Sequence, residues 1–209
     1  MKFLKIDLET YTKEEVDFIA GEILNGKVVV LPTDTIYGLS AIATSQKAID
    51  KIYAIKGRKL EDQKHLILLV KSFCMVRRYC FLSKKQYAYL KEKWTEGERA
   101  LTVILKGRRD YFKKLDINLF EIITDDDGVA VRRPNNKFLL ELIKKVGEPI
   151  VSTSLNITGE EDLKNVSVAD KYFKDIKPDL VVDIGLLPER QPSRLEDLRS
   201  MDDIKVYRK

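Results

Sequence analysis

Two clusters of hydroxyl, carboxyl and amide side chains stand out, because each follows a short apolar run. The first is PTDTIYGL, residues 32–39, which follows Val28–Leu31, and the second is STSLNITGE, residues 152–160, which follows Pro149–Val151. Apolar runs of this length bounded by glycine, proline or asparagine are typical of buried strands. Both clusters are therefore expected at the carboxyl ends of strands, where open α/β sheets bind their ligands.

Fixed positive charges accompany these clusters. Lys56 and Arg58 come at the end of a predicted helix over 45–55, and Arg132 and Arg133 follow another apolar run. The dipole of a helix also favours cations at its C-terminus, so Lys56 and Arg58 could form a simple helix-end charge pair. Loop hydroxyls and a turn asparagine are equally ordinary when taken alone. In combination, however, hydroxyls, an amide and cations suit a nucleotide and a small polar co-substrate.

The elements that must position these residues follow from hydrophobic periodicity and capping signals. Helices are predicted at residues 13–25, 45–55, 84–94, 136–146 and 168–175. Strands are predicted at residues 27–31, 66–70, 101–105, 122–123, 129–131, 149–151, 180–182 and 204–207. This alternation predicts an α/β fold of three layers, in which helices flank a twisted mixed β-sheet.

Composition restricts the classes of function. The 209 residues, of which 44% are hydrophobic and 34% charged, are expected to form a single soluble domain over 1–209. No apolar run has the length of a signal peptide or a membrane span, so we expect a cytoplasmic protein with no membrane contact. Two cysteines, Cys74 and Cys80, and one histidine, His65, provide neither a disulfide framework nor a zinc site of familiar spacing. The net charge of +5 weakly favours anionic partners.

Three motifs in fixed order resemble those of the YrdC-like threonylcarbamoyl-AMP synthase family. They are PTDTIYGL, the Lys-x-Arg at 56 and 58, and the Ser-x-Asn at 154 and 156, and the resemblance extends over nearly the whole chain from about residue 10. It implies a YrdC-like fold and a nucleotidyltransferase that makes threonylcarbamoyl-adenylate and pyrophosphate from L-threonine, bicarbonate and ATP. In the family, a downstream threonylcarbamoyl transferase complex then modifies an adenosine of tRNA.

The same resemblance implies roles for individual residues. It assigns catalysis to Lys56 and Arg58, threonine binding to Thr35, Arg132, Ser154 and Ser193, and nucleotide binding to Lys56, Arg58, Asn156 and Arg208. Mg²⁺ would bridge the phosphate oxygens of ATP, without protein ligands. Because carbamates decompose in water, the cleft should exclude solvent. The tail, residues 188–209, carries Ser193 and Arg208 and is expected to act as a lid. Residues 192–209 are expected to be needed for catalysis but not for folding.

The chain also departs from the family pattern. Leu155 stands where the family usually has alanine, Arg58 is not followed by Asn-Pro-Leu, and Glu96–Arg99 replaces Pro-Gly-Pro. These changes leave two alternatives open, a non-catalytic RNA-binding paralogue that recognises tRNA or double-stranded RNA, and a carbamoyl-adenylate-forming enzyme with another acceptor. The intact Lys-x-Arg and Ser-x-Asn pairs favour catalysis. The methyl group of threonine is expected to contact Leu155 or Ile157.

Overall fold

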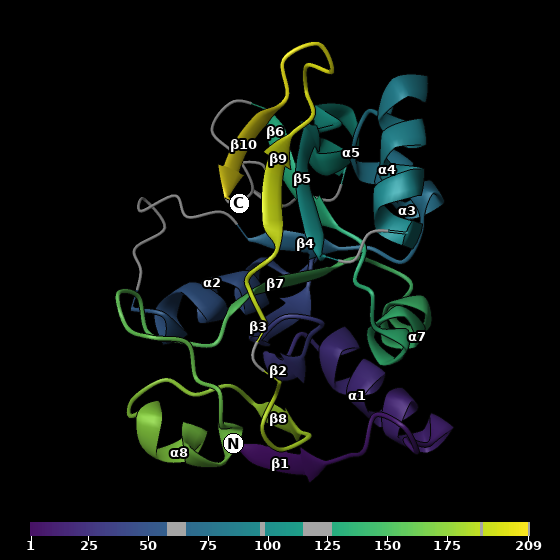
Figure 1. Ribbon diagram of the computed structural model, residues 1–209. Helices are drawn as coiled ribbons and strands as arrows, with labels where there is room; N and C mark the ends of the chain where they lie inside the picture. The colour runs from purple at the N-terminus through teal and green to yellow at the C-terminus, as the bar shows by residue number, and fades with distance from the viewer. Residues whose placement is uncertain (58–65, 97–98, 115–126, 189, 209) are drawn as a thin grey trace.

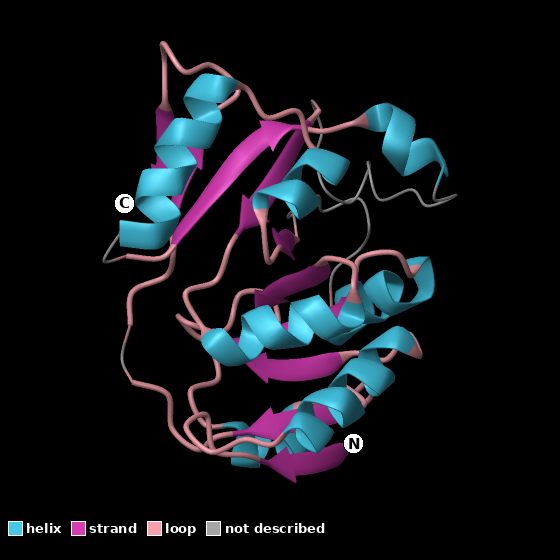
Figure 2. Ribbon diagram, turned by 90° about the vertical axis from the view of Figure 1, so that its right-hand side faces the viewer, coloured by secondary structure: helices cyan, strands magenta, loops and turns pink. Residues whose placement is uncertain are grey.

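A single mixed sheet organises the molecule (Figures 1 and 2). The computed structural model describes all residues except 58–65, 97–98, 115–126, 189 and 209. Across the sheet the strands are ordered β1-β8-β2-β3-β7-β4-β6-β5-β9-β10. In chain order they are β1 (Lys2–Lys5), β2 (Val29–Pro32), β3 (Tyr37–Ile42), β4 (Ile67–Leu69), β5 (Leu101–Lys106), β6 (Gly128–Arg132), β7 (Ile150–Ser154), β8 (Leu180–Asp183), β9 (Arg194–Asp197) and β10 (Lys205–Arg208). The predicted α/β class with a mixed sheet is confirmed.

Helices pack against this sheet. They are α1 (Lys13–Leu24), α2 (Gln46–Ile55), α3 (Phe73–Tyr79), α4 (Lys84–Glu96), α5 (Arg109–Lys114), α7 (Lys137–Val146) and α8 (Ala169–Tyr172). In Figure 1, α1 and α7 lie to the right of the lower strands and α2 lies to the left, while Figure 2 looks onto the side that carries α1 and α7. None of the helices in the described part of the chain has the length and apolar character needed to cross a bilayer.

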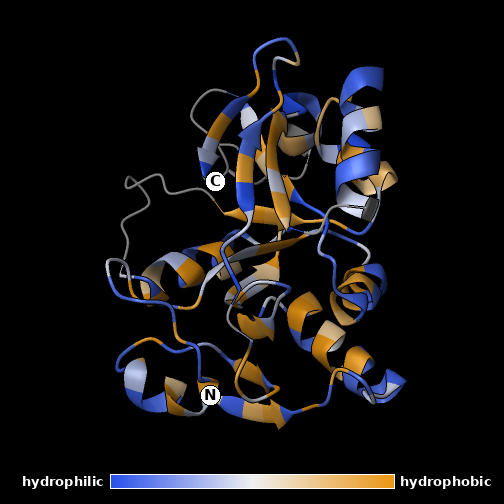
Figure 3. Ribbon diagram, in the orientation of Figure 1, coloured by the Kyte–Doolittle hydropathy of each residue, from blue (hydrophilic) through white to orange (hydrophobic). Residues whose placement is uncertain are grey.

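Local sequence explains where the principal helices begin and end. The Thr12 hydroxyl accepts a hydrogen bond from the Glu15 amide, and the Glu15 carboxylate accepts one from the Thr12 amide, so α1 starts with a capping box. The helix α7 ends at Gly147, whose φ of 80° lies in the left-handed region that favours glycine. Both helices bury an apolar stripe, and the central strands are predominantly hydrophobic in Figure 3, whereas α4 is mostly hydrophilic.

The first polar cluster begins at the carboxyl end of β2, as predicted. Residues 33–36 connect β2 to β3 in an antiparallel hairpin, and the rest of the cluster, residues 37–39, belongs to β3. The strand β3 was not predicted, because its composition, YGLSAI, includes glycine and serine and lacks a regular alternation of polar and apolar residues. The strands β1 and β9 and the helices α3 and α5 were also not predicted. The predicted helix over 168–175 is shorter, and the predicted strand at 122–123 lies outside the described residues.

The C-terminal tail contributes an inner strand of the sheet. The strand β9 pairs in parallel with β5 on one side and antiparallel with β10 on the other. Leu198 is fully buried, and its carbonyl oxygen accepts a hydrogen bond of 2.7 Å from the Gln86 side chain. The position of β9 inside the sheet argues against the expectation that folding does not need residues 192–209. Closure of the tail as a lid stays a prediction.

Truncation after Leu187 is expected to abolish cooperative unfolding, because it removes β9 and leaves β5 as an exposed edge. Burial of Leu198 alone contributes about 2 kcal/mol. The measurement is urea denaturation followed by circular dichroism. Truncation after Asp203, which removes the exposed strand β10 and retains β9, is the matched control and should leave a cooperative transition. A cooperative transition with the parental midpoint after the longer truncation would contradict the prediction.

Candidate active site

A small cavity lies on the face of the sheet where β3, β7, β4 and β6 are neighbours. Its volume of about 180 Å³ is smaller than that of the usual pocket for a drug-sized ligand. This central cavity is lined by Thr33, Thr35, Ile36, Gly38, Ile67, Leu69, Arg132, Ser152, Thr153, Ser154, Pro192, Ser193 and Arg208. The fold thus brings together all four residues predicted to bind threonine, together with Arg208 from the predicted nucleotide set.

The guanidinium of Arg132 is the main charged group of the central cavity. Arg132 is 4% exposed, and its Nη2 donates a hydrogen bond to the Asp34 carboxylate. Both terminal nitrogens also donate to the Thr35 hydroxyl, at 3.2 and 3.3 Å. Its Nε is buried and has no hydrogen-bond partner among the described residues. Because a buried donor without an acceptor is costly, an oxygen atom of a ligand would stabilise this arrangement.

The Asp34 carboxylate fixes the orientation of Arg132. Its second oxygen accepts a hydrogen bond of 3.0 Å from the Asn135 amide, so the carboxylate is held from two sides. Burial lowers the pKa of Arg132 below its ordinary value, the Asp34 charge opposes this shift, and the Arg208 charge adds to it. Arginine does not lose its proton in proteins, so Arg132 remains charged beside its carboxylate partner and presents a cation to a small cavity.

Ser193 and Arg208 belong to the tail and close the central cavity from the other side. Arg208 donates from Nε to the Ser193 carbonyl at 2.6 Å and from Nη2 to the Ser193 hydroxyl at 2.9 Å. The Ser193 hydroxyl also shares a hydrogen bond of 2.8 Å with Thr102. Burial lowers the pKa of Arg208, and the nearby charge of Arg99 lowers it further. Arg132 and Arg208 both line the central cavity, and their positive charges repel each other. An anionic ligand between them would relieve this repulsion.

Lys56 lies at the C-terminal end of α2, as its place in the sequence predicted. It is 1% exposed, and its Nζ donates hydrogen bonds to the Ser154 carbonyl, the Asn156 carbonyl and the Asn156 side-chain oxygen, at 2.8, 2.9 and 2.7 Å. The Ser154 hydroxyl donates to the same Asn156 oxygen at 2.7 Å. Lys56 thus anchors the segment that carries Ser154 into the cavity, and direct contact of Lys56 with a phosphate stays a prediction. Arg58 lies outside the described residues.

The sequence prediction did not include two residues that bind the side chains of the cavity without lining it. Asp34, inside PTDTIYGL, binds Arg132, and Thr102, a fully buried hydroxyl in the otherwise apolar stretch LTVIL, shares a hydrogen bond with Ser193. Gly38 is needed because a Cβ there would lie 2.5 Å from the Ser152 hydroxyl oxygen. Among the described residues, no group of three or more His, Cys, Asp or Glu side chains could hold a metal ion.

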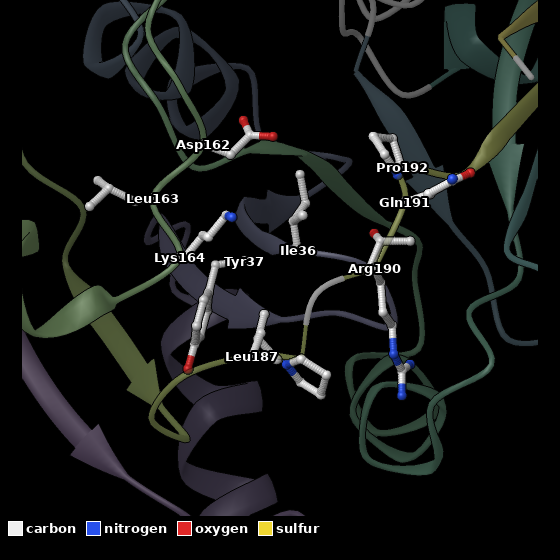
Figure 4. A pocket seen from close by; sticks show the side chains of 11 residues that line it. Ile36, Tyr37, Asp162, Leu163, Lys164, Leu187, Arg190, Gln191 and Pro192 are labelled. Atoms are coloured by element: carbon white, nitrogen blue, oxygen red, sulfur yellow. The ribbon is translucent and has the colours of Figure 1, made fainter.

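A larger side cavity of about 510 Å³ adjoins the central one and shares Thr35, Ile36 and Pro192 with it. Figure 4 shows Leu163 and Lys164 on one side and the segment from Arg190 to Pro192 on the other, with Ile36 and Tyr37 between them. The Tyr37 hydroxyl donates to the Gly185 carbonyl at 2.7 Å, and burial raises its pKa to about 12. The side cavity therefore combines apolar walls, which come from Ile36, Leu163 and Leu187, with the charged side chains of Asp162, Lys164 and Arg190. A largely apolar lining with a few polar groups is typical of sites for organic ligands.

Comparisons with known proteins identify relatives of this chain. A relative from Methanocaldococcus jannaschii, named as a provisional threonylcarbamoyl-AMP synthase, is 35% identical over 90% of this chain and 82% of that protein. A relative from Pseudoalteromonas translucida, named threonylcarbamoyl-AMP synthase, is 27% identical over 84% of this chain and 88% of its own length. A relative from mouse, also named threonylcarbamoyl-AMP synthase, is 30% identical over 81% of this chain and 55% of that protein.

Solved structures show the same fold. Sua5 from P. abyssi, in complex with L-threonine, superposes with a TM-score of 0.79 at 26% identity over 94% of this chain, which spans 54% of that Sua5 chain. YciO from E. coli superposes with a TM-score of 0.79 at 23% identity over 100% of this chain and 94% of its own, which shows the fold alone. The sequence model of Sua5, YciO and YrdC proteins, described as "Telomere recombination", matches residues 22–209. This chain belongs to the Sua5/YciO/YrdC family.

Proposed function

We propose that this protein is a threonylcarbamoyl-AMP synthase, which forms threonylcarbamoyl-adenylate and pyrophosphate from L-threonine, bicarbonate and ATP. The observation that carries the proposal is the convergence of Thr35, Arg132, Ser154 and Ser193 on one small cavity that contains a buried cation. Relatives named for this activity, which align with most of the chain, support it. The proposed product is passed to a downstream threonylcarbamoyl transferase complex for modification of tRNA in the cytoplasm.

Threonine would bind in the central cavity through its carboxylate. The carboxylate oxygens can accept a hydrogen bond from Nε of Arg132, which is buried and has no partner among the described residues. They can also accept hydrogen bonds from the hydroxyl groups of Thr35 and Ser193. The α-amine would then attack bicarbonate, with loss of water, to give the carbamate. Within a cavity enclosed by the tail, this unstable carbamate is protected from bulk water.

ATP would occupy the side cavity with its base and direct its α-phosphate towards the central cavity, because the two share Thr35, Ile36 and Pro192. A carbamate oxygen attacks the α-phosphorus, the bond to the β-phosphate oxygen breaks, and pyrophosphate leaves. Positively charged groups stabilise the charge that spreads over the phosphate oxygens in this transition state. Arg208 lies at the central cavity and is suited to this role. Mg²⁺ would enter with ATP as part of the substrate.

Pyrophosphate release is the test of the proposed function. It is measured with MgATP alone, with threonine or bicarbonate added singly, and with both together. We expect release only when both are present, because the carbamate must form before adenylation. Release without threonine would indicate another carbamoyl acceptor. Absence of release under every combination, together with RNA binding that weakens steeply with salt, would favour the RNA-binding paralogue instead.

A further inference from the structure

Two apolar side chains of β4 form part of the floor of the central cavity. Ile67 and Leu69 both line it, and the residue between them, Leu68, is fully buried in the core. This arrangement follows from the strand itself, since residues two apart project from the same face of a sheet. Ile67 is partly exposed, whereas Leu69 is 2% exposed. A ligand in the cavity would thus meet a hydrocarbon surface between its polar walls.

The register of the sheet places this surface between the two sets of polar groups. Ile67 pairs with Ser152 on β7, and Leu69 pairs with Arg132 on β6. Partners in neighbouring strands present their side chains on the same face, with Cβ atoms about 5 Å apart. A ligand that reaches from the Arg132 guanidinium to the serine hydroxyls of β7 must therefore cross Ile67 and Leu69.

The residues expected to contact the methyl group of threonine do not occupy this position. Leu155 is fully buried, and it is absent from the residues that line the central cavity. Ile157 lines a different cavity of about 560 Å³, together with Tyr172 and Phe173. The expectation that Leu155 or Ile157 forms the methyl pocket is therefore wrong for the cavity that contains Arg132.

We infer that Ile67 and Leu69 contact the methyl group of the bound amino acid and determine the preference of the site for threonine over serine. This inference rests on the proposed function. With the carboxylate held by Arg132 and the hydroxyl facing the serines of β7, the remaining substituent of the β-carbon lies against β4. Gly38 supports this geometry, because a side chain there would displace the Ser152 hydroxyl. One buried methyl group corresponds to a discrimination of about ten- to two-hundredfold.

The test compares L-threonine, L-serine and L-2-aminobutyrate, which has the methyl group and lacks the hydroxyl. In Ile67→Ala, kcat/KM for threonine and for 2-aminobutyrate should fall by about tenfold or more, while that for serine changes little. The threonine-to-serine ratio should therefore collapse to within a few-fold, with the KM for ATP unchanged. Ile67→Val should give an intermediate ratio, and it keeps the test available if the alanine variant folds poorly.

The control is Leu4→Ala, which shortens a partly buried apolar side chain on the edge strand β1, and it should leave the ratio at the parental value. If Ile67 were only structural, its replacement would lower the activity with threonine and serine equally, and an unchanged ratio would overturn the inference. Calorimetric titration of the parent and Ile67→Ala with threonine and with serine measures the same preference without turnover. Failure of pyrophosphate release therefore counts against the proposed function, whereas an unchanged binding preference counts against the role of β4.

Discussion

Replacing Lys56 by alanine is expected to lower turnover by about a hundredfold or more. The ammonium donates hydrogen bonds to three oxygens of Ser154 and Asn156, and its loss removes their charged donor. The uncharged Ser154 hydroxyl and the backbone amide of Asn156 still donate to two of these oxygens. Hydrogen bonds of charged groups contribute about 1.5–3 kcal/mol each, so the segment that presents Ser154 to the cavity should rearrange. The measurement is steady-state pyrophosphate release, combined with thermal unfolding of the same variant.

Lys51 provides a matched control on the same helix. It forms a salt bridge of 2.7 Å with Asp179, in which both side chains are about one-third exposed. Such pairs contribute about 0–1 kcal/mol, so Lys51→Ala should keep turnover and lose little stability. Turnover of Lys56→Ala within about threefold of the parent, the effect of an ordinary surface change, would show that Lys56 is only a helix-end charge.

Replacing Arg132 by lysine is expected to raise the KM for threonine by about ten- to a hundredfold, with a much smaller effect on the KM for ATP. Lysine preserves the charge beside Asp34, and it loses the planar fork whose Nε has no partner among the described residues. A charge-assisted hydrogen bond to the threonine carboxylate is worth about 1.5–3 kcal/mol, and each 1.4 kcal/mol is a factor of ten in affinity. Initial rates at varied threonine and fixed ATP give the value.

Asp34→Asn tests whether Asp34 acts by positioning the Arg132 guanidinium, which itself is proposed to bind threonine. The amide has one acceptor oxygen, so it can accept a hydrogen bond from Arg132 or from the Asn135 amide, and it no longer compensates the buried charge. Because the planar fork of Arg132 is retained, the KM for threonine should rise less than in Arg132→Lys. Arg133→Lys serves as the control, since Arg133 donates instead to the carbonyl oxygens of Lys71 and Trp94. Equal changes of both KM values in Arg132→Lys would contradict the assignment of Arg132 to threonine.

Much of the fold could be predicted from local patterns. The capping box at Thr12, the apolar stripe of α1 and the buried run of β2 are encoded within a few residues, and all appear close to their predicted positions. The strand β9 could not be predicted in this way. Its residues, RLED, carry three charges, and they form a strand because β5 and β10 provide hydrogen-bonding partners from distant parts of the chain.

The sequence by itself determined the α/β class, the main helices and the residue types that converge on the site, because periodicity, capping and motif order are local properties. Only the tertiary structure decided which of those residues meet. It oriented Arg132 through Asp34, bound Lys56 to Asn156, and placed Ile67 beside Ser152 and Leu69 beside Arg132. The two hydrogen-bonded pairs join residues about 100 positions apart. All these contacts depend on strand order and register, which a single sequence does not specify.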